Sequence, residues 1–473
     1  MNRSGEDFLG ELRLGRKLKT VPQAASAGIL ITLGLVILLA DPLLKGLGTK
    51  APFVPLLALL LFTLNLLNVL EMLAGSGDRG GAYALVYEVL GGWGAMLTGA
   101  AILAGALAVT AALTRLAVLE LSGFAFFAAL PASILAAGFL TLLLLVQFFH
   151  IDPARISFRL LVLPLLAALL FEIVTSLTRI NLDVFRRPVF ELEGTARAAA
   201  LMATGYLAFE ALFSERRQVR AALRVIPRAL VLILGVLTIL SFLVFFDLAG
   251  QNVSTRTSTI IILDALSVTG WLPPWVLALL FLVILFFAAH TALSTAAFQI
   301  QTLILEGALP AFPSRVRRSL RTPLIILALS AGIVVPLLLF APADWLLPVA
   351  AALFLVAMSL LDLAAIVSRS REPDRRRTVV LPFAPLIPLL AIALNVGLLG
   401  SLPVPVLAAS GVWLAAASGL YFIFALPRQT EHRSRELSIG APPDVPDRDG
   451  HRPRILVPLE PGEEHHLVLS LAL

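Results

Sequence analysis

Long apolar runs dominate the chain from residue 21 to residue 426, and short segments rich in arginine separate them. About twelve runs have or approach the roughly 17–25 residues that a helix needs to cross a bilayer. They lie at 21–41, 52–73, 90–114, 124–149, 157–177, 198–213, 229–249, 271–304, 323–341, 345–367, 380–399 and 402–426. The pattern predicts an all-α polytopic membrane protein of about twelve transmembrane helices.

Composition supports a membrane protein. Apolar residues make up 59% of the 473 residues and charged residues 14%, whereas charged residues make up about a quarter of a soluble domain. The net charge of +6 comes from basic residues in the short segments between runs, so nucleic acid is not expected as a partner. With the N-terminus inside, the inner segments hold roughly three times as many Lys and Arg as the outer ones, which predicts cytoplasmic ends in the inner membrane. The absence of cysteine excludes disulfides and thiolate metal sites.

The sixth apolar run is short and polar in its middle. Thr204, Gly205 and Tyr206 interrupt it, and Glu210 follows one turn later. Hydrocarbon leaves polar groups unpaired, and non-helical backbone at membrane depth is tolerated where it faces a cavity. We therefore predict a broken helix that forms half of a binding site. A glycine kink with Tyr206 packed against a neighbouring helix is the alternative.

The composition also divides the chain into segments. Residues 1–20 are expected to be a cytoplasmic N-terminal segment and residues 21–426 a transmembrane transporter domain. Residues 427–453 are polar and rich in Pro, Asp and Arg, as in a linker. Residues 454–473 read as the start of a truncated cytoplasmic βα domain, with a disordered tail as the alternative.

Three blocks of residues, in matching order, resemble the amino acid–polyamine–organocation (APC) permeases over residues 20–427. They are Glu71 with Gly80-Gly81-Ala82-Tyr83, then Gly205–Glu210 with Glu215 and Ile226-Pro227-Arg228, then Glu306-Gly307-Ala308-Leu309-Pro310. The resemblance implies a LeuT-type 5+5 inverted repeat, at about 21–177 and 198–367, with two further helices over 380–426. It also implies a secondary active transporter of amino acids or related small amines that works by alternating access. The tail resembles the opening of a universal-stress-protein domain, whose full-length form would bind a nucleotide or regulator.

The resemblance also implies where a substrate binds, between breaks in the first and sixth spans. The residues are Ser26, Ala27, Gly28 and Ile29 in the first span and Thr204, Gly205, Tyr206 and Ala208 in the sixth. Backbone N–H groups around Gly28 would hold a carboxylate, and Tyr206 would read the side chain. Gly28→Val is then expected to abolish binding in a folded protein. The alternative for Gly28 is a close helix–helix contact.

Four residues are candidates for ion coupling, and the coupling ion is sodium or a proton. Ser294 and Thr295 offer the oxygen ligands that sodium prefers, although such hydroxyls usually bond to the carbonyl four residues earlier. His290 and Glu172 are proton candidates, because ionisable groups at membrane depth are functional candidates by default. An interhelical hydrogen bond is the alternative for His290. No other metal and no cofactor are expected.

The remaining acidic residues are assigned structural or gating roles. Glu71, Glu210 and Glu215, and also Glu88 and Asp362, fall towards the inner ends of spans, where loop arginines can pair with them. One alternative function is an importer of inorganic cations such as potassium, with the same fold and a regulatory tail. A membrane enzyme is another. The sequence has no His-Glu-x-x-His, Gly-x-Ser-x-Gly or Walker motif, so the enzyme is disfavoured.

Overall fold

Each predicted apolar run overlaps a helix in the computed structural model, because backbone in a membrane must satisfy its own hydrogen bonds. The elements of the first part are α2 (Val21–Leu47), η1 (Gly48–Phe53), α3 (Val54–Leu73), α4 (Ala82–Ser122), α5 (Ala132–Phe148), α7 (Leu163–Ser176), α8 (Leu192–Met202), η5 (Ala203–Gly205) and α9 (Tyr206–Ser214). Those of the second are α10 (Ala222–Gly250), α12 (Pro274–Leu305), α13 (Leu324–Phe340), α14 (Ala343–Arg371), α15 (Leu386–Gly400), α16 (Val404–Leu420) and the π-helical turn η8 (Tyr421–Ala425).

The structure describes residues 20–73, 81–148, 163–176, 180, 185, 192–214, 222–251, 273–305, 307–309, 324–371, 381 and 385–427. Over these residues the all-α prediction is confirmed. Residues 1–427 form one structural unit and residues 428–473 a second. The predicted linker and βα segment, and nearly all of the predicted N-terminal segment, lie outside the described residues.

Six helical stretches in the described part of the chain are long and apolar enough to cross a membrane, and three apolar helices are shorter. The six are Val21–Leu73, Ala82–Ser122, Arg224–Gly250, Pro274–Ile304, Ala343–Arg371 and Val404–Ala425. The number of crossings and the inverted repeat stay predictions.

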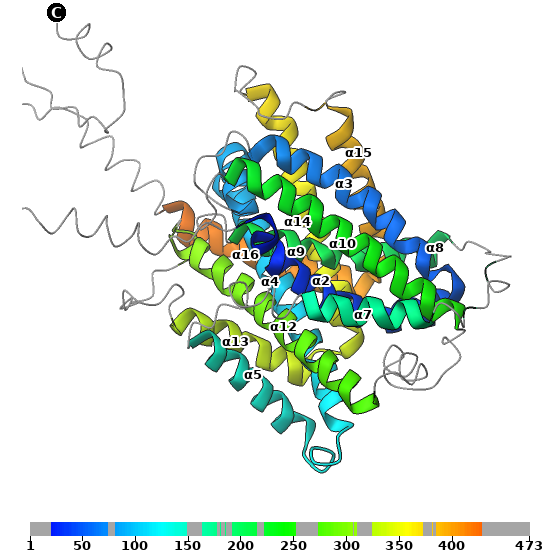
Figure 1. The fold of residues 1–473 in the computed structure, drawn as a ribbon. Helices are drawn as coiled ribbons and strands as arrows, with labels where there is room; N and C mark the ends of the chain where they lie inside the picture. Colours follow the sequence, from blue (N-terminus) through cyan, green and yellow to red (C-terminus); the bar gives the residue numbers. More distant parts are fainter. Residues whose placement is uncertain are drawn as a thin grey trace, which may run out of the picture. The chain divides into compact units, whose positions relative to one another are not determined.

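Two helices, α2 and α4, form the centre of the unit (Figure 1). α2 packs against α10 and α12, and α4 packs against α12 and α14. Small residues let these helices approach closely, as is common in membranes. A Cβ placed on Gly34 of α2 would lie 2.3 Å from the Cβ of Ala288 in α12, and one on Gly105 of α4 would lie 2.8 Å from the ring of Phe354 in α14.

A kink divides α4 at Gly91, whose φ of 78° and ψ of −173° are not helical. Such a positive φ suits glycine, which lacks a Cβ. Arg371, the last residue of α14, donates a hydrogen bond of 2.7 Å from Nη1 to the carbonyl of Val89, just before the kink. The predicted run 90–114 therefore corresponds mainly to the part of α4 after the kink. α4 itself, from Ala82 to Ser122, extends beyond this run at both ends.

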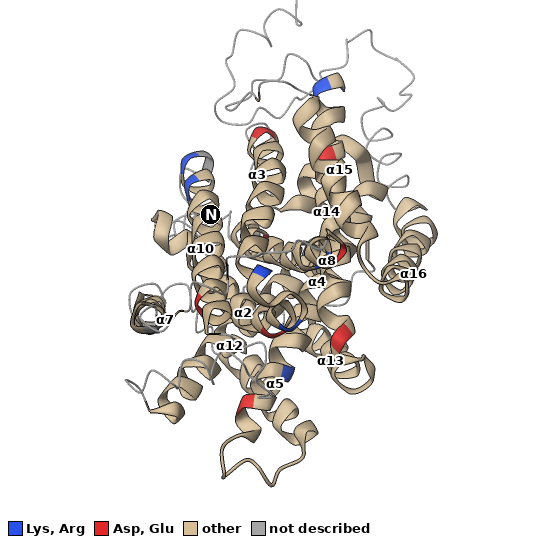
Figure 2. Ribbon diagram, turned by 90° about the vertical axis from the view of Figure 1, so that its right-hand side faces the viewer, with Lys and Arg blue, Asp and Glu red and all other residues tan. Residues whose placement is uncertain are grey.

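Charged residues are sparse on the helices (Figure 2). Many large apolar side chains are exposed. On α16 and η8, Val404, Val412 and Ile423 are 76%, 70% and 66% exposed. Exposed apolar surface of this kind suits contact with lipid. Arg115 of α4 is a partly buried charged residue. Its Nη2 donates hydrogen bonds to the carbonyl of Ala341 at 2.6 Å and to that of Leu338 at 2.8 Å. It thereby satisfies carbonyls at the end of α13.

Candidate functional site

The sixth predicted span is interrupted where the sequence indicated. The turn η5 (Ala203–Gly205) has 3₁₀ geometry and separates α8 from α9. Its flanking residues keep right-handed helical dihedrals, with φ −62° and ψ −20° at Met202 and φ −57° and ψ −29° at Tyr206. The backbone is therefore tightened and not unwound, so the prediction of an open break that reaches Ala208 is wrong for this structure. The hydroxyl of Thr204 donates to the carbonyl of Leu201 at 2.8 Å, which satisfies one group at the turn.

The predicted break in the first span is absent. α2 continues as an α-helix through Ser26, Ala27, Gly28 and Ile29, all of which are buried. Hydroxyl groups reinforce its backbone, because Ser26 donates to the carbonyl of Gln23 at 2.8 Å and Thr32 donates to that of Gly28 at 2.9 Å. In this conformation the backbone N–H groups at Gly28 lie inside a helix and not at its beginning. They are therefore not free to hold a carboxylate here.

The structure nevertheless brings the two predicted segments together. A Cβ on Gly28 would lie 2.7 Å from the carbonyl oxygen of Ala208 in α9 and 2.4 Å from Cδ1 of Ile233 in α10. Gly28 therefore permits a close contact between three helices, which was the alternative for this residue. The same holds for Gly205, where a Cβ would lie 2.8 Å from Leu237 and 3.0 Å from the ring of Phe62.

Glu210 of α9 is a buried carboxylate that joins three helices. It accepts hydrogen bonds from Nε2 of Gln299 in α12 at 2.5 Å and from the phenol of Tyr206 at 3.5 Å. It also accepts a hydrogen bond from the backbone N–H of Ala82, the first residue of α4. A negative charge is favourable at a helix N-terminus, where N–H groups lack intrahelical partners. The Gly81-Ala82 motif and the glutamate of the sixth span, remote in sequence, are thus direct partners.

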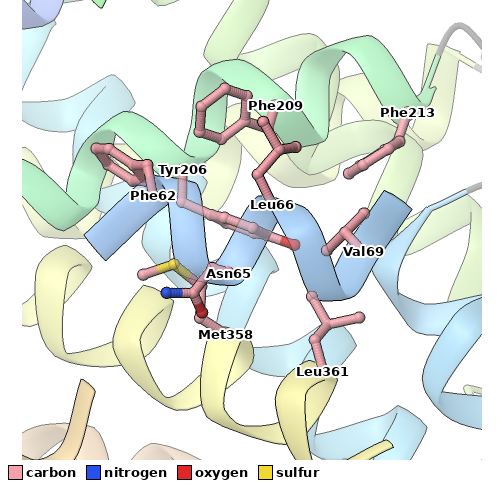
Figure 3. A pocket seen from close by; sticks show the side chains of 9 residues that line it. All are labelled: Phe62, Asn65, Leu66, Val69, Tyr206, Phe209, Phe213, Met358 and Leu361. Carbon is pink, nitrogen blue, oxygen red and sulfur yellow. The ribbon is translucent and has the colours of Figure 1, made fainter. Parts of the chain in front are cut away.

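A small cavity lies beside this carboxylate, between α3, α9 and α14. Figure 3 shows the side chains that line it, namely Phe62, Asn65, Leu66, Val69, Tyr206, Phe209, Phe213, Met358 and Leu361. The ring of Tyr206 lies 5.9 Å from that of Phe354 and 6.4 Å from that of Phe209, measured between centroids. The cavity volume of about 10 Å³ holds about one water molecule. An amino acid would fit only after the helices move apart.

A buried polar cluster adjoins the cavity through Asn65, and its asparagines are not among the predicted site residues. Asp362 of α14 accepts hydrogen bonds from Nδ2 of Asn68 in α3 at 2.7 Å and from Nδ2 of Asn395 in α15 at 3.0 Å. The prediction that Asp362 pairs with a loop arginine is wrong. The sequence feature that could have indicated this cluster is a pair of asparagines one turn apart in the second apolar run, Asn65 and Asn68.

Glu71 has an arginine partner. Arg369 of α14 donates from Nε and Nη2 to the two carboxylate oxygens of Glu71, at 2.7 Å and 2.5 Å. The same Nη2 also donates to the carbonyl of Leu381 at 3.1 Å. This bidentate ion pair ties the end of α3 to the end of α14, as a structural or gating contact would. Glu215 lies outside the described residues, and Glu172 lies in α7, where the structure describes its backbone alone.

The hydroxyls of α12 bond to the carbonyls one turn earlier. Ser294 donates to the carbonyl of His290 at 2.8 Å, and Thr295 donates to that of Thr291 at 2.9 Å. Gln147 of α5 donates from Nε2 both to the hydroxyl oxygen of Ser294, at 2.9 Å, and to the carbonyl of His290, at 3.1 Å. In this conformation Ser294 therefore contributes to packing between α5 and α12. Within the described residues, no group of three or more His, Cys, Asp and Glu is placed to hold a metal ion.

Comparison with known proteins gives one family. Residues 20–425 match the family described as amino acid permease. The match covers the helices α2 to α16 and therefore includes the cavity, Glu210 and the buried polar cluster. No curated protein matches the sequence.

Proposed function

The chain belongs to the amino acid permease family, and from this premise we propose that it is a secondary active transporter of amino acids or related small amines. The family points to a multi-pass membrane transporter and not to an enzyme. The observation that carries the proposal is the interrupted segment α8–η5–α9, which packs against α2 and borders a cavity at Tyr206. Interrupted helices at the interface between repeats form the substrate sites of many transporters.

We place the substrate where α2 and α9 meet, next to Tyr206. In this structure Gly28 and Ala208 are in close contact and the adjoining cavity is small, so the bound form requires α2 and α9 to separate. A substrate that binds the separated form more tightly would shift the population towards it. On this proposal the closed contact is one state of an alternating-access cycle, in a protein with LeuT-type inverted repeats.

Binding can be measured on the purified protein. Each of the twenty amino acids, a set of small amines, and potassium and rubidium salts are added in turn, and thermal stability is recorded. A ligand that binds the folded state stabilises it by mass action, so at least one amino acid or amine is expected to raise the melting temperature. Stabilisation by potassium and rubidium, with none by any amino acid or amine, would instead support the cation importer.

Tyr206→Ala is expected to change which ligands stabilise the protein. The substitution enlarges the cavity by removing a ring that is buried against Phe209 and Phe354, and it leaves the backbone of η5 in place. Larger side chains should therefore gain affinity relative to small ones. Val412→Ala on the exposed face of α16 is the control, because that side chain is 70% exposed. An identical ligand profile for Tyr206→Ala and the wild type would remove Tyr206 from the site.

The proposed topology has both ends in the cytoplasm and twelve crossings of the inner membrane. Single cysteines at Thr49 and Ser254 are expected to react with an impermeant thiol reagent added outside intact cells. A cysteine at Ser314 is expected to react only after permeabilisation. The native chain has no cysteine, so background labelling is absent. Labelling of position 314 in intact cells would reject this orientation.

Uphill transport requires the gradient of a second solute, which is either a coupling ion or an exchanged substrate. Sodium at Ser294 and Thr295, and a proton at His290 or Glu172, stay predictions. A nucleotide or regulator for the C-terminal tail is likewise a proposal that rests on the resemblance of residues 454–473.

A further inference from the structure

The buried polar cluster joins α3, α14 and α15 at the level of the cavity. Besides its bonds to Asp362, Asn395 donates to Oδ1 of Asn65 at 3.1 Å, and Asn65 donates to Oδ1 of Asn395 at 3.3 Å. Asn68, Asn395 and Asp362 are completely buried, and Asn65 is 3% exposed. The consecutive helices α14 and α15 thus meet α3, which is remote in sequence, through four polar side chains and a single formal charge.

The charge of Asp362 has no ion pair within the described part of the chain. Its hydrogen-bond partners, Asn68 and Asn395, are neutral amides. The basic groups of α14 are already in use, because Arg369 binds Glu71 and Arg371 binds the carbonyl of Val89. Burial of an unpaired carboxylate costs several kcal/mol, and a protein commonly avoids this cost by protonating the group. Asp362 is therefore a group whose charge state can change within the membrane.

The amides around Asp362 can serve both of its protonation states. An asparagine side chain carries two N–H donors and one carbonyl acceptor. In this structure Asn68 and Asn395 turn their donors towards Asp362, which suits the ionised carboxylate. The carbonyl oxygen Oδ1 of Asn68 is buried and has no hydrogen-bond partner among the residues that the structure describes. Rotation of this amide by half a turn would present Oδ1 to a protonated Asp362. The same cluster can therefore form hydrogen bonds with both the protonated and the ionised form of Asp362.

The cluster is connected to the proposed substrate site. Asn65 and Leu361, the neighbour of Asp362 on α14, both line the cavity with Tyr206 (Figure 3). Tyr206 in turn donates a hydrogen bond to Glu210, which accepts the backbone N–H at the start of α4. Through Asn65, the Asp362 cluster therefore borders the same cavity as the side chain that is proposed to face the substrate.

The other ionisable groups near α14 come from the elements that pack against it, which are α3, α4, α8, η5, α15 and α16. On the described residues of these elements they are Glu71, Tyr83, Tyr87, Glu88, Arg115, Glu120, Glu193 and Arg197, with Tyr206 and Glu210 on the adjoining α9. Of these, Glu71 is paired with Arg369, and Glu210 accepts hydrogen bonds from Ala82, Gln299 and Tyr206. Within the cluster of Asn65, Asn68, Asp362 and Asn395, Asp362 is the side chain that can ionise.

We propose that Asp362 is a proton-binding site that couples substrate transport to the proton gradient. The inference rests on the proposed function, because coupling presupposes transport. The proton adds to one carboxylate oxygen when the site is open to the acidic side. It leaves from the same oxygen when the site is open to the other side. In this scheme Asn68, Asn395 and Asn65 are positioning residues that stabilise the two forms in turn.

The test uses the purified full chain in sodium-free proteoliposomes, with each of the twenty amino acids and a set of small amines supplied in radiolabelled form. Two assays are compared: accumulation driven by an acidic exterior, and counterflow in vesicles preloaded with the same unlabelled compound. Wild type is expected to show both, and a protonophore should abolish accumulation alone. Asp362→Asn, which cannot exchange a proton, is expected to retain counterflow and to lose accumulation. Asp247→Asn, a buried carboxylate on α10 bonded to Gln251, is the matched control and should accumulate as wild type does.

The outcomes separate the inference from the function on which it rests. Accumulation by Asp362→Asn equal to that of wild type, or accumulation by wild type that requires sodium, would overturn the inference and leave the transporter standing. Absence of counterflow in wild type with every amino acid and every small amine would overturn both. Should Asp362→Asn fail to fold, Asn68→Ala decides the question. It removes a donor to the ionised form, so accumulation should persist to a higher external pH, and an unchanged pH profile would contradict the proposal.

Discussion

Gly28→Ala is expected to lower the melting temperature of the purified protein markedly. The added methyl group would lie 2.7 Å from the carbonyl oxygen of Ala208 and 2.4 Å from Cδ1 of Ile233. The side chain of Ile233 can rotate away, but the oxygen belongs to the backbone of α9, so α2 and α9 must move apart. Overpacking of this kind costs about 1–3 kcal/mol. Gly28→Val adds two further methyl groups and should destabilise more, so the binding test expected from the sequence would be confounded by loss of fold.

Gly46→Ala is the matched control for this prediction. It lies on the same helix, and a Cβ at Gly46 would meet nothing within 4 Å. Replacing glycine by alanine inside a helix gains about 0.5–1 kcal/mol when space is available, so this variant should melt at or above the wild-type temperature. Equal melting of Gly28→Ala and wild type would show that α2 and α9 are not in contact as described.

Glu210→Ala is expected to destabilise the protein strongly. It leaves three buried donors without their acceptor: the N–H of Ala82, the amide of Gln299 and the phenol of Tyr206. Each buried group left unpaired costs about 1–3 kcal/mol. The N-terminus of α4 also loses the negative charge that its unpaired N–H groups favour. The expected result is a protein that melts well below wild type or does not accumulate in the membrane.

Two further variants separate the roles of shape and charge at this position. Glu210→Gln keeps the shape and one acceptor oxygen, so its loss of stability should be smaller than that of Glu210→Ala. Glu193→Ala removes an exposed glutamate from α8, in the same interrupted segment, and should leave the melting temperature within error of wild type. If Glu210→Ala were as stable as Glu193→Ala, the carboxylate would not be the link between α9, α4 and α12.

The helices could be predicted from the sequence because a segment inside a membrane must satisfy its own backbone hydrogen bonds, which an α-helix does. Apolar runs of sufficient length identify such segments. The interruption at η5 was also visible, since Thr204 and Gly205 stand in an otherwise apolar run. The conformation of Ser26–Ile29 could not be predicted from the sequence, because the same small and hydroxylated residues suit either a break in a helix or a tight contact between helices. In α2 the hydroxyls bond to carbonyls of the same helix, and the small residues allow α9 and α10 to approach.

The partners of the buried polar groups could not be assigned from one sequence. Asn65 and Asn395 are 330 residues apart, and Asn68 and Asp362 are 294 apart. Their contact depends on which helices become neighbours, and apolar patterning does not specify this. The sequence did place Glu71 near the end of its span, where an arginine could reach it, and Arg369 occupies that place. Polar residues in apolar runs thus mark where function should be sought, and the fold supplies their partners.

The measurement that tests the central claim most directly is uptake by proteoliposomes that contain the purified protein. Each labelled amino acid, a set of labelled small amines and labelled rubidium are offered separately, with empty vesicles as the background. The account predicts saturable uptake of at least one amino acid or small amine, lower uptake by Gly28→Ala, and rubidium uptake equal to the background. Saturable rubidium uptake, with every amino acid and amine at the background, would contradict the assignment of this chain as an amino acid transporter.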